Sequence, residues 1–242
     1  MKGRLVRRDR LGGVERDAMY RLLDEHFEGI SRERFESDLE EKNWVLLLEE
    51  AGRLLGFSTL LLYESGDGAP FSVVYSGDTI VGRGAWGSMA LPGSWIAAVR
   101  ALWEREGRGR LFWLLLTSGF RTYRFLPVFW RDFHPRHDAP VPVAVRELLG
   151  RLAEERLGSA FRPETGIARF RSPQVLRADL RRIPIGRSAD PHVTFFTQRN
   201  PGWVDGDELV CLTEIAVENL TPAGRRMWTH GQCEWENPRG DA

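Results

Sequence analysis

The sequence predicts an α/β fold built on a mixed sheet and extended at its C-terminal end. The chain has 242 residues, more than one average domain needs and fewer than two ordinary domains occupy. Hydrophobic residues make up 42% of it, and 34 basic side chains balance 34 acidic ones, unlike the composition of disordered proteins. Strand-like segments alternate with helical patterns along the first half, which is the order of an α/β protein.

The composition also narrows the class of protein. The balanced charge argues against a nucleic-acid binder, which normally carries a basic excess. The longest purely apolar run, 111–116, is too short to span a bilayer, and residues 1–10 are not followed by a signal-peptide core. Cys211 and Cys233 provide neither a disulfide framework nor zinc-ligand spacing. We therefore expect a cytoplasmic protein without a bound metal, a membrane span or a nucleic-acid partner.

The first third of the chain predicts a strand, two helices and a hairpin. Gly12 and Gly13 separate the first strand from an amphipathic helix, and Ser31 is a suitable cap for the second helix. Large apolar and β-branched residues then form two runs around a short break at 50–52. The expected elements are a strand at 4–8, helices at 14–27 and 32–42, and hairpin strands at 44–49 and 53–63.

The middle of the chain predicts a β-α-β crossover. A turn at 65–70 leads into a strand at 71–81, a glycine loop at 82–87 and a helix at 88–106. The continuous apolar run at 111–116 is typical of a strand that is covered on both faces. A short helix at 122–130, interrupted by Pro127, is expected to follow it.

The residues after 138 differ from the first part of the chain in their charge and in their pattern of apolar residues. Residues 139–190 hold one amphipathic helix, at 143–157, and ten basic against six acidic side chains, which suggests an insertion or a small subdomain. The segments 192–198 and 208–217 flank two turn signals and predict a terminal β-hairpin. The expected division is a core at 1–138, a helical, arginine-rich insertion at 139–190, and a hairpin with its tail at 191–242.

The glycine loop is the clearest candidate ligand site. Its residues, Gly82-Arg83-Gly84-Ala85-Trp86-Gly87, match G-x-G-x-x-G between a strand and a helix, where backbone amides can meet a pyrophosphate, although a purely structural turn fits as well. A nicotinamide site would need an acidic residue at the end of the next strand, which instead runs into Thr117. A Rossmann-type NAD-dependent oxidoreductase is therefore the weaker alternative.

The order of elements in residues 1–135, with the final hairpin, resembles the GNAT superfamily of N-acyltransferases. In that family a Q/R-x-x-G-x-G/A loop binds the pyrophosphate of acyl-CoA. The corresponding stretch here keeps Arg83 and Gly84 but has Val81 in place of Gln or Arg and Trp86 in place of a small residue. The resemblance implies a GNAT-like fold whose donor-binding residues are Ile80, Val81, Gly82, Arg83, Gly84, Ala85, Trp86 and Gly87.

The resemblance also implies two catalytic side chains. Asp78 stands on the long strand just before the loop, where family members commonly keep a carboxylate that deprotonates the amine. Tyr123 follows the buried strand, where the family often has a tyrosine that protonates the departing thiolate. The alternatives are a turn or capping aspartate in a bulge at 76–78, and a tyrosine that only packs among neighbouring phenylalanines.

The activity that these residues imply is transfer of an acyl group from a thioester to an amine of a small molecule or peptide. The donor is either acyl-CoA or the pantetheine of an acyl carrier protein. A long acyl chain is favoured over acetyl because the pyrophosphate loop is degenerate and the expected cleft is aromatic. The large aromatic residues either line a wide acyl tunnel or fill a core; they include Trp86, Trp95, Trp103, Trp113 and Trp130. Ten acidic residues in 24–50 suit a cationic acceptor, although such runs are usually solvated helix faces. A non-catalytic GNAT-like binding module is the competing class, and a homodimer is left open.

Three other groups offer weaker chemistry. His134 and His137 are two imidazoles in one loop, which makes an incomplete metal site. Cys211 lies in an apolar strand, where a buried structural thiol is expected rather than a nucleophile. Ser118 lacks the glycine pattern of a serine-hydrolase elbow.

Overall fold

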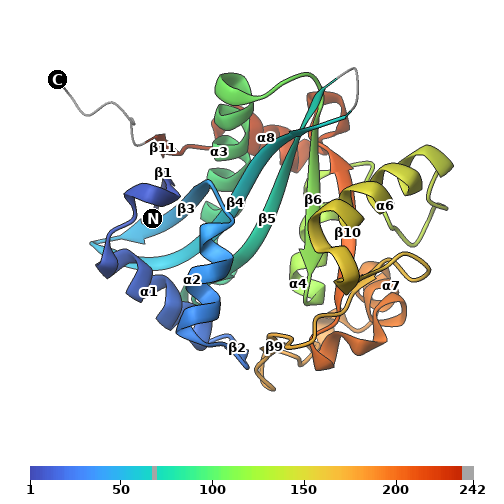
Figure 1. Ribbon diagram of the computed structural model, residues 1–242, viewed down its shortest axis with the longest axis horizontal. Coiled ribbons are helices and arrows are strands. Elements are labelled where there is room, and N and C mark those ends of the chain that lie inside the picture. Colours follow the sequence, from blue (N-terminus) through green and yellow to red (C-terminus); the bar gives the residue numbers. More distant parts are fainter. Residues whose placement is uncertain (67–69, 236–242) are drawn as a thin grey trace. The chain divides into compact units, whose positions relative to one another are not determined.

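The chain folds into two compact units, each of which contains strands and helices (Figure 1). The computed structural model describes residues 1–66 and 70–235, so part of the predicted turn at 65–70 and the end of the predicted tail lie outside the described residues. The first unit comprises residues 1–25, 30–111 and the chain from 222 onward. The second unit comprises 26–29 and 112–221. Both units mix helices with strands, so the predicted α/β class is confirmed.

The sheet of the first unit is antiparallel apart from one edge. Its strands lie in the order β11 (Glu234–Trp235), β1 (Lys2–Arg7), β3 (Trp44–Glu50), β4 (Arg53–Ser65) and β5 (Phe71–Val81). Only β11 runs parallel to its neighbour, β1. The predicted hairpin and the strand at 71–81 are therefore confirmed. The antiparallel pairing of β5 with β4 argues against the nicotinamide alternative, because the strand before the glycine loop of a Rossmann fold has parallel neighbours on both sides.

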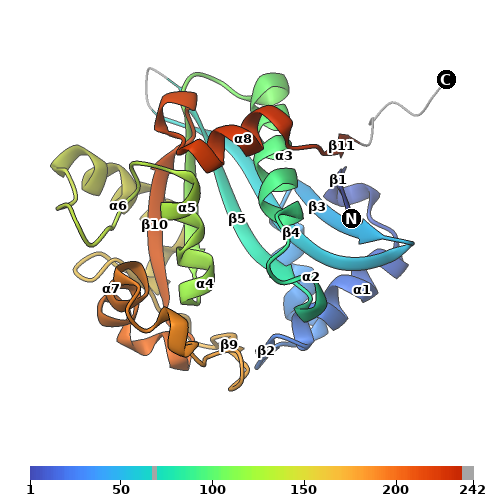
Figure 2. The ribbon, with the colours of Figure 1, turned by 180° about the vertical axis from the view of Figure 1, so that it is seen from behind.

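Four helices cover this sheet. Figures 1 and 2 show α1 (Gly13–Asp24) and α2 (Arg32–Glu40) on one face, and α3 (Ala90–Glu106) and α8 (Pro222–His230) on the other. The Ser31 side chain accepts a hydrogen bond from the amide of Arg34, as expected of a cap. Helix α1 ends three residues earlier than predicted, because Phe27 belongs to a strand of the second unit. Helix α8 was not predicted.

The second unit has a sheet in the order β6 (Leu111–Thr117), β10 (Glu208–Glu214), β8 (Ile167–Ala168) and β7 (Phe161–Arg162). A separate pair joins β2 (Phe27–Glu28) to β9 (Val175–Leu176). Its helices are α4 (Phe120–Tyr123), α5 (Phe125–Phe129), α6 (Val143–Leu157) and α7 (Pro191–Arg199). Part of the predicted insertion 139–190 pairs with β10 in this unit through β8. The two units therefore have different bounds from the predicted segments 1–138, 139–190 and 191–242.

The predicted terminal hairpin is wrong in its first strand. Residues 192–198 lie in α7, because Pro191 occupies the first turn and the Asp190 side chain accepts a hydrogen bond from the amide of His192 at 3.0 Å. Val193 and Phe196 share the buried face of this helix, a helical spacing that their strand-forming character obscured. The strand β10 pairs instead with β6 and β8.

The length and apolar character of the helices bear on whether the chain could cross a membrane. Within the described ranges, no helix combines the length and the apolar character that a membrane crossing needs.

Candidate functional site

Asp78 lies on a β-bulge of the first unit. Ser58 of β4 pairs with Thr79 of β5, whereas Leu60 pairs with Ser76. Two residues of β5, Gly77 and Asp78, therefore stand opposite the single Thr59. Such a bulge redirects side chains within a strand. The bulge that the sequence suggested at 76–78 is confirmed, and it gives Asp78 a direction that regular pairing would not.

The Asp78 side chain is half-buried, and this burial disfavours its ionised form. Loss of solvent raises the pKa of Asp78 to about 6, although the nearby cations Lys42 and Arg34 act to lower it. Asp38 on α2 adds a second negative charge that raises it further. Within the described part of the chain, the Asp78 carboxylate makes no hydrogen bond. A carboxylate with these properties is free to accept a proton near neutral pH.

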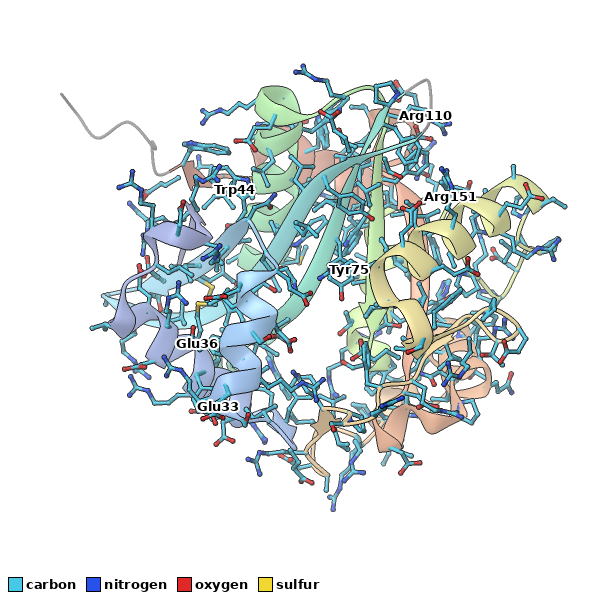
Figure 3. All side chains as sticks on the ribbon, in the orientation of Figure 1. Glu33, Glu36, Trp44, Tyr75, Arg110 and Arg151 are labelled. Carbon is cyan, nitrogen blue, oxygen red and sulfur yellow. The ribbon has the colours of Figure 1, made fainter. Side chains whose placement is uncertain are left out.

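The cation beside Asp78 comes from the turn between α2 and β3. Lys42 is buried, and its Nζ donates a hydrogen bond to the backbone oxygen of Asp38 at 2.9 Å. Its ammonium lies 5.4 Å from the ring centroid of Tyr75, the β5 residue labelled in Figure 3. Burial also raises the pKa of Asp38. The bulge therefore joins two carboxyl groups, one ammonium and one aromatic ring from α2 and β5.

Gly77→Ala is expected to reduce the free energy of unfolding by about 1–3 kcal/mol through overpacking. A Cβ at this position would lie 2.6 Å from Thr59 Oγ1 and 2.8 Å from Lys42 Cε. The matched control is Gly84→Ala, where a Cβ meets no atom within 4 Å and the stability should hardly change. Urea denaturation measures both variants. Equal stability of the two would contradict the close packing at the bulge.

The glycine loop forms a tight turn after β5. Residues Arg83–Ala85 make one turn of 3-10 helix, and the amides of Ala85 and Trp86 donate to the carbonyls of Gly82 and Arg83 at 2.9 and 3.3 Å. The Trp86 indole donates to the carbonyl of Val81 at 2.8 Å. Gly87, at φ +84°, reverses the chain before α3. Two loop amides that an anion would use are therefore already bonded.

The other predicted donor-binding residues divide between the strand and the exposed turn. Ile80 is buried and pairs with Phe57 in the sheet. Arg83 and Gly84 are exposed, and the space around the Cα of Gly84 is open. A ligand is therefore reached from the turn and not from the strand, and the binding role of residues 80–87 stays a prediction.

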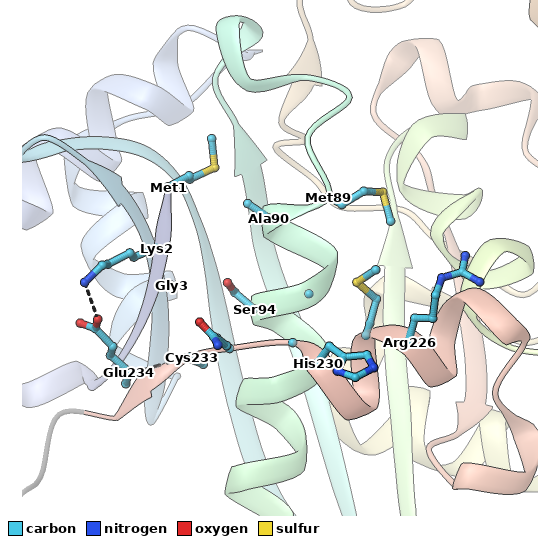
Figure 4. Close-up of a pocket in the computed structure, with 14 residues that line it drawn as sticks. Met1, Lys2, Gly3, Met89, Ala90, Ser94, Arg226, His230, Cys233 and Glu234 are labelled. Atoms are coloured by element: carbon cyan, nitrogen blue, oxygen red, sulfur yellow. Dashed lines mark hydrogen bonds and ion pairs between the residues drawn. The ribbon is translucent and has the colours of Figure 1, made fainter.

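A pocket of about 710 Å³ lies elsewhere in the first unit (Figure 4). Gly231 allows the end of α8 to approach α3, because a Cβ on Gly231 would clash with the backbone carbonyl of Gly93. Three of the four methionines of the chain line it, namely Met1, Met89 and Met227. The lining includes none of the predicted site residues.

Tyr123 is enclosed within the second unit. Its side chain is fully buried, and its hydroxyl donates a hydrogen bond to the carbonyl of Pro135 at 2.9 Å. The rings of Phe133, Phe195 and Phe196 lie 6.1, 5.9 and 5.7 Å from its ring. Burial raises the pKa of Tyr123 above its ordinary value. These contacts agree with the packing alternative, and the role of general acid stays a prediction.

Tyr123→Phe is expected to lower stability by about 1–2 kcal/mol, because the half-buried Pro135 carbonyl loses its donor. Thermal unfolding and steady-state turnover measured on the same sample separate packing from catalysis. A loss of turnover beyond about 100-fold with unchanged donor affinity would support the general acid. Stability loss alone assigns the tyrosine to packing. Tyr20→Phe, at a half-buried tyrosine of α1, is the matched control.

The tryptophans that suggested a wide acyl tunnel mostly fill cores. Trp95 is buried in the first unit, and Trp113 and Trp130 stack 5.0 Å apart in the second. Trp86 in the glycine loop is 45% exposed. These positions favour the core alternative over a tunnel lined by indoles.

Several of the acidic residues in 24–50 are paired with arginine. Glu36 of α2, labelled in Figure 3, lies 2.6 Å from Arg16 and 2.7 Å from Arg32. Glu49 likewise lies 3.1 Å from Arg4. The negative potential expected from residues 24–50 is reduced accordingly.

The cysteine and histidine candidates are buried or packed against neighbouring side chains. Cys211 is buried as predicted, and burial raises the pKa of its thiol. His134 Nε2 lies 3.2 Å from Asp132 Oδ1, while the ring of His137 packs 4.6 Å from that of His192. Among the described residues, no group of three or more histidine, cysteine or acidic side chains is placed to hold a metal ion.

Sequence reasoning missed Lys42 and Asp38. Both lie near the end of α2 in an acidic run that looked like a solvated helix face. One available signal was that Lys42 and Lys2 are the only lysines among 34 basic residues. No pattern in the sequence showed that Lys42 turns inward to the bulge.

Comparisons with known proteins find relatives only among solved structures. No family model and no curated protein matches the chain. A Mycobacterium tuberculosis protein solved with CoA is 13% identical over 88% of this chain and 99% of its own, with a TM-score of 0.41. A probable N-acyltransferase from Enterococcus faecalis is 13% identical over 89% and 66%, with a TM-score of 0.41. Glucosamine-6-phosphate N-acetyltransferase from Arabidopsis thaliana is 12% identical over 47% and 82%, with a TM-score of 0.36. The chain is thus similar, at low identity, to solved acyltransferases, the class of enzyme whose superfamily its sequence resembles.

Proposed function

We propose that the protein is a GNAT-like N-acyltransferase that moves an acyl group from a thioester to an amine. The observation that carries this proposal is Asp78, a half-buried carboxyl group on a bulge just before the glycine loop. Its pKa of about 6 leaves it mostly ionised at neutral pH and makes it a stronger base than an ordinary aspartate. The resemblance of the element order to the GNAT superfamily supplies the choice of reaction.

The proposed chemistry needs no covalent enzyme intermediate. The amine nitrogen attacks the thioester carbonyl carbon, the new C–N bond forms, and the C–S bond then breaks. Asp78 accepts the proton that the amine loses, directly or through water. The thiolate takes up a proton as it leaves, and Tyr123 is the proposed source of that proton.

The donor is proposed to meet the exposed turn that follows β5. Arg83 offers a cation there, and the open space at Gly84 leaves room for a phosphate to approach the backbone. The hydrogen bonds within the loop would have to be exchanged for bonds to the ligand. Either acyl-CoA or a carrier-protein pantetheine fits this proposal. The buried positions of Trp95, Trp113 and Trp130 remove one of the two reasons to favour a long acyl chain, and the degenerate loop is the other.

Calorimetry and thiol release together test the proposal. The full chain is titrated with CoA, acetyl-CoA and a long-chain acyl-CoA, and thiol release is then followed with small amines, peptides and an acyl carrier protein. Binding of a donor with amine-dependent thiol release is the expected result. The enzyme proposal fails if no donor binds and no thioester is consumed.

The second candidate is a binding module without turnover. It is favoured by the loop geometry, because the amides of Ala85 and Trp86 already donate hydrogen bonds within the turn. Such a module would bind CoA or an acyl-CoA while the thioester stays intact with every amine tested. The same titrations therefore separate the two candidates.

A further inference from the structure

Lys42 is an unusual residue in this chain. The sequence has thirty-two arginines but only two lysines, Lys2 and Lys42. The Lys2 side chain is 78% exposed, whereas that of Lys42 is 5% exposed. Lysine is a compact cation on a flexible stem, and burying it costs free energy unless nearby groups stabilise the charge. A buried ammonium therefore needs a physical account.

The bulge of β5 makes room for this side chain. Gly77 is one of the two bulge residues that stand opposite Thr59. Because Gly77 has no Cβ, Lys42 Cε can pack there; a Cβ would lie only 2.8 Å from it. The same glycine lets Thr59 Oγ1 approach from β4. The lysine stem consequently lies against the strand that carries Asp78.

Three groups then hold the ammonium in place. The backbone oxygen of Asp38 accepts a hydrogen bond from it, and the face of Tyr75 provides a cation–π contact. The Glu41 carboxylate lies 3.9 Å from Nζ. These contacts come from α2, from the turn that follows it and from β5, so the position of the charge is fixed from more than one side.

The charged groups that act on Asp78 among the described residues are Lys42, Arg34 and Asp38. The two cations favour the ionised form of Asp78, whereas Asp38 and burial favour the protonated form. Arg34 is engaged with Asp38 at 3.6 Å. The charge of Lys42 has a larger effect on Asp78 than those of Asp38 and Arg34, so it is the main one that offsets burial.

We propose that Lys42 is a positioning residue for Asp78: its ammonium, fixed beside the bulge by the Asp38 carbonyl and the Tyr75 ring, stabilises the Asp78 carboxylate, and Asp38 is the opposing charge. This inference rests on the proposed function only in taking Asp78 as the base. Lys42 sets the lower pH limit of the reaction without touching the substrate. Removing the Lys42 charge and removing the Asp38 charge have opposite effects on Asp78.

The test follows the Asp78 carboxyl carbon directly by carbon-13 NMR titration of the full chain, with its signal assigned by its loss in Asp78→Asn. Lys42→Met keeps the length of the stem and removes the charge, so the pKa of Asp78 should rise by roughly one unit or more. Asp38→Asn keeps the backbone acceptor of Lys42, and the pKa of Asp78 should fall. The acid limb of the pH–rate profile should move in the same directions, while the plateau rate stays unchanged.

Lys2→Met is the matched control, because it removes the exposed lysine and should leave both readouts unmoved. An unchanged Asp78 pKa in Lys42→Met overturns the inference. If Lys42→Met does not fold, an unchanged pKa in Asp38→Asn overturns it instead. The NMR titration needs no substrate, so absence of acyl transfer would count against the proposed function and not against this inference.

Discussion

Asp78→Asn is expected to lower acyl transfer by about 100- to 10,000-fold, because asparagine cannot accept the proton of the attacking amine. The loss should be greatest above about pH 6, where the Asp78 carboxylate of the natural chain is ionised and can accept that proton. Donor affinity should stay unchanged, since the exposed turn at Arg83 and Gly84 is not altered. Steady-state kinetics from about pH 5 to about pH 9, with calorimetry of donor binding, measure both quantities.

The same variant should be more stable than the natural chain at neutral pH. Burial raises the pKa of Asp78 from 3.8 to about 6, so the folded state holds this proton more tightly than the unfolded state. Stability is therefore lost as pH rises from about 4 to about 6, where the buried group becomes charged. Asparagine removes that loss. Asp9→Asn, at an exposed aspartate paired with Arg7, is the control for both readouts. Full turnover in Asp78→Asn would remove the base assignment.

Trp44→Ala is expected to reduce the free energy of unfolding by about 3–5 kcal/mol. Trp44, labelled in Figure 3, is fully buried at the start of β3. Its ring lies 4.6 Å from that of Trp235 and 5.2 Å from the Arg7 guanidinium, and its indole donates to Glu106 at 3.3 Å. Alanine leaves a cavity where β1, β3, α3 and β11 meet. Calorimetric melting or urea denaturation measures the loss.

Trp86→Ala is the matched control for this prediction. It deletes the same side chain from the exposed glycine loop and should cost less than about 1 kcal/mol. Losses of similar size in the two variants would show that Trp44 does not join these elements.

The sequence predicted the regular elements of the first unit well, because their patterns are long. Residues 71–75 and 79–81 are mostly strand formers on either side of the bulge at 76–78, and the observed strand has the predicted bounds. The two-residue strands β7, β8 and β9 are too short to show any period. The helix at 191–199 was missed because aromatic and β-branched residues dominate it, although Asp190 and Pro191 carried the signal of a helix start.

The candidate site was predictable only along a single strand. The place of Asp78 before a glycine loop followed from local sequence. Its relation to Lys42 depends on how α2 packs against β5, which no local pattern records. The surroundings of Tyr123 come from Phe133, Phe195 and Phe196, so its enclosure was likewise invisible until the chain was folded.

The division of the chain has a consequence for its synthesis. Helix α8 packs on α3, and β11 covers the outer edge of β1, yet both emerge from the ribosome more than a hundred residues after α3. At about 5–20 residues per second, the apolar side of α3 waits for roughly 6 to 25 seconds and the edge of β1 for roughly 11 to 45 seconds. Unpaired strand edges and uncovered helices are the surfaces that nascent chains aggregate through. The nascent protein is therefore expected to depend on chaperones until residues 222–235 have left the exit tunnel.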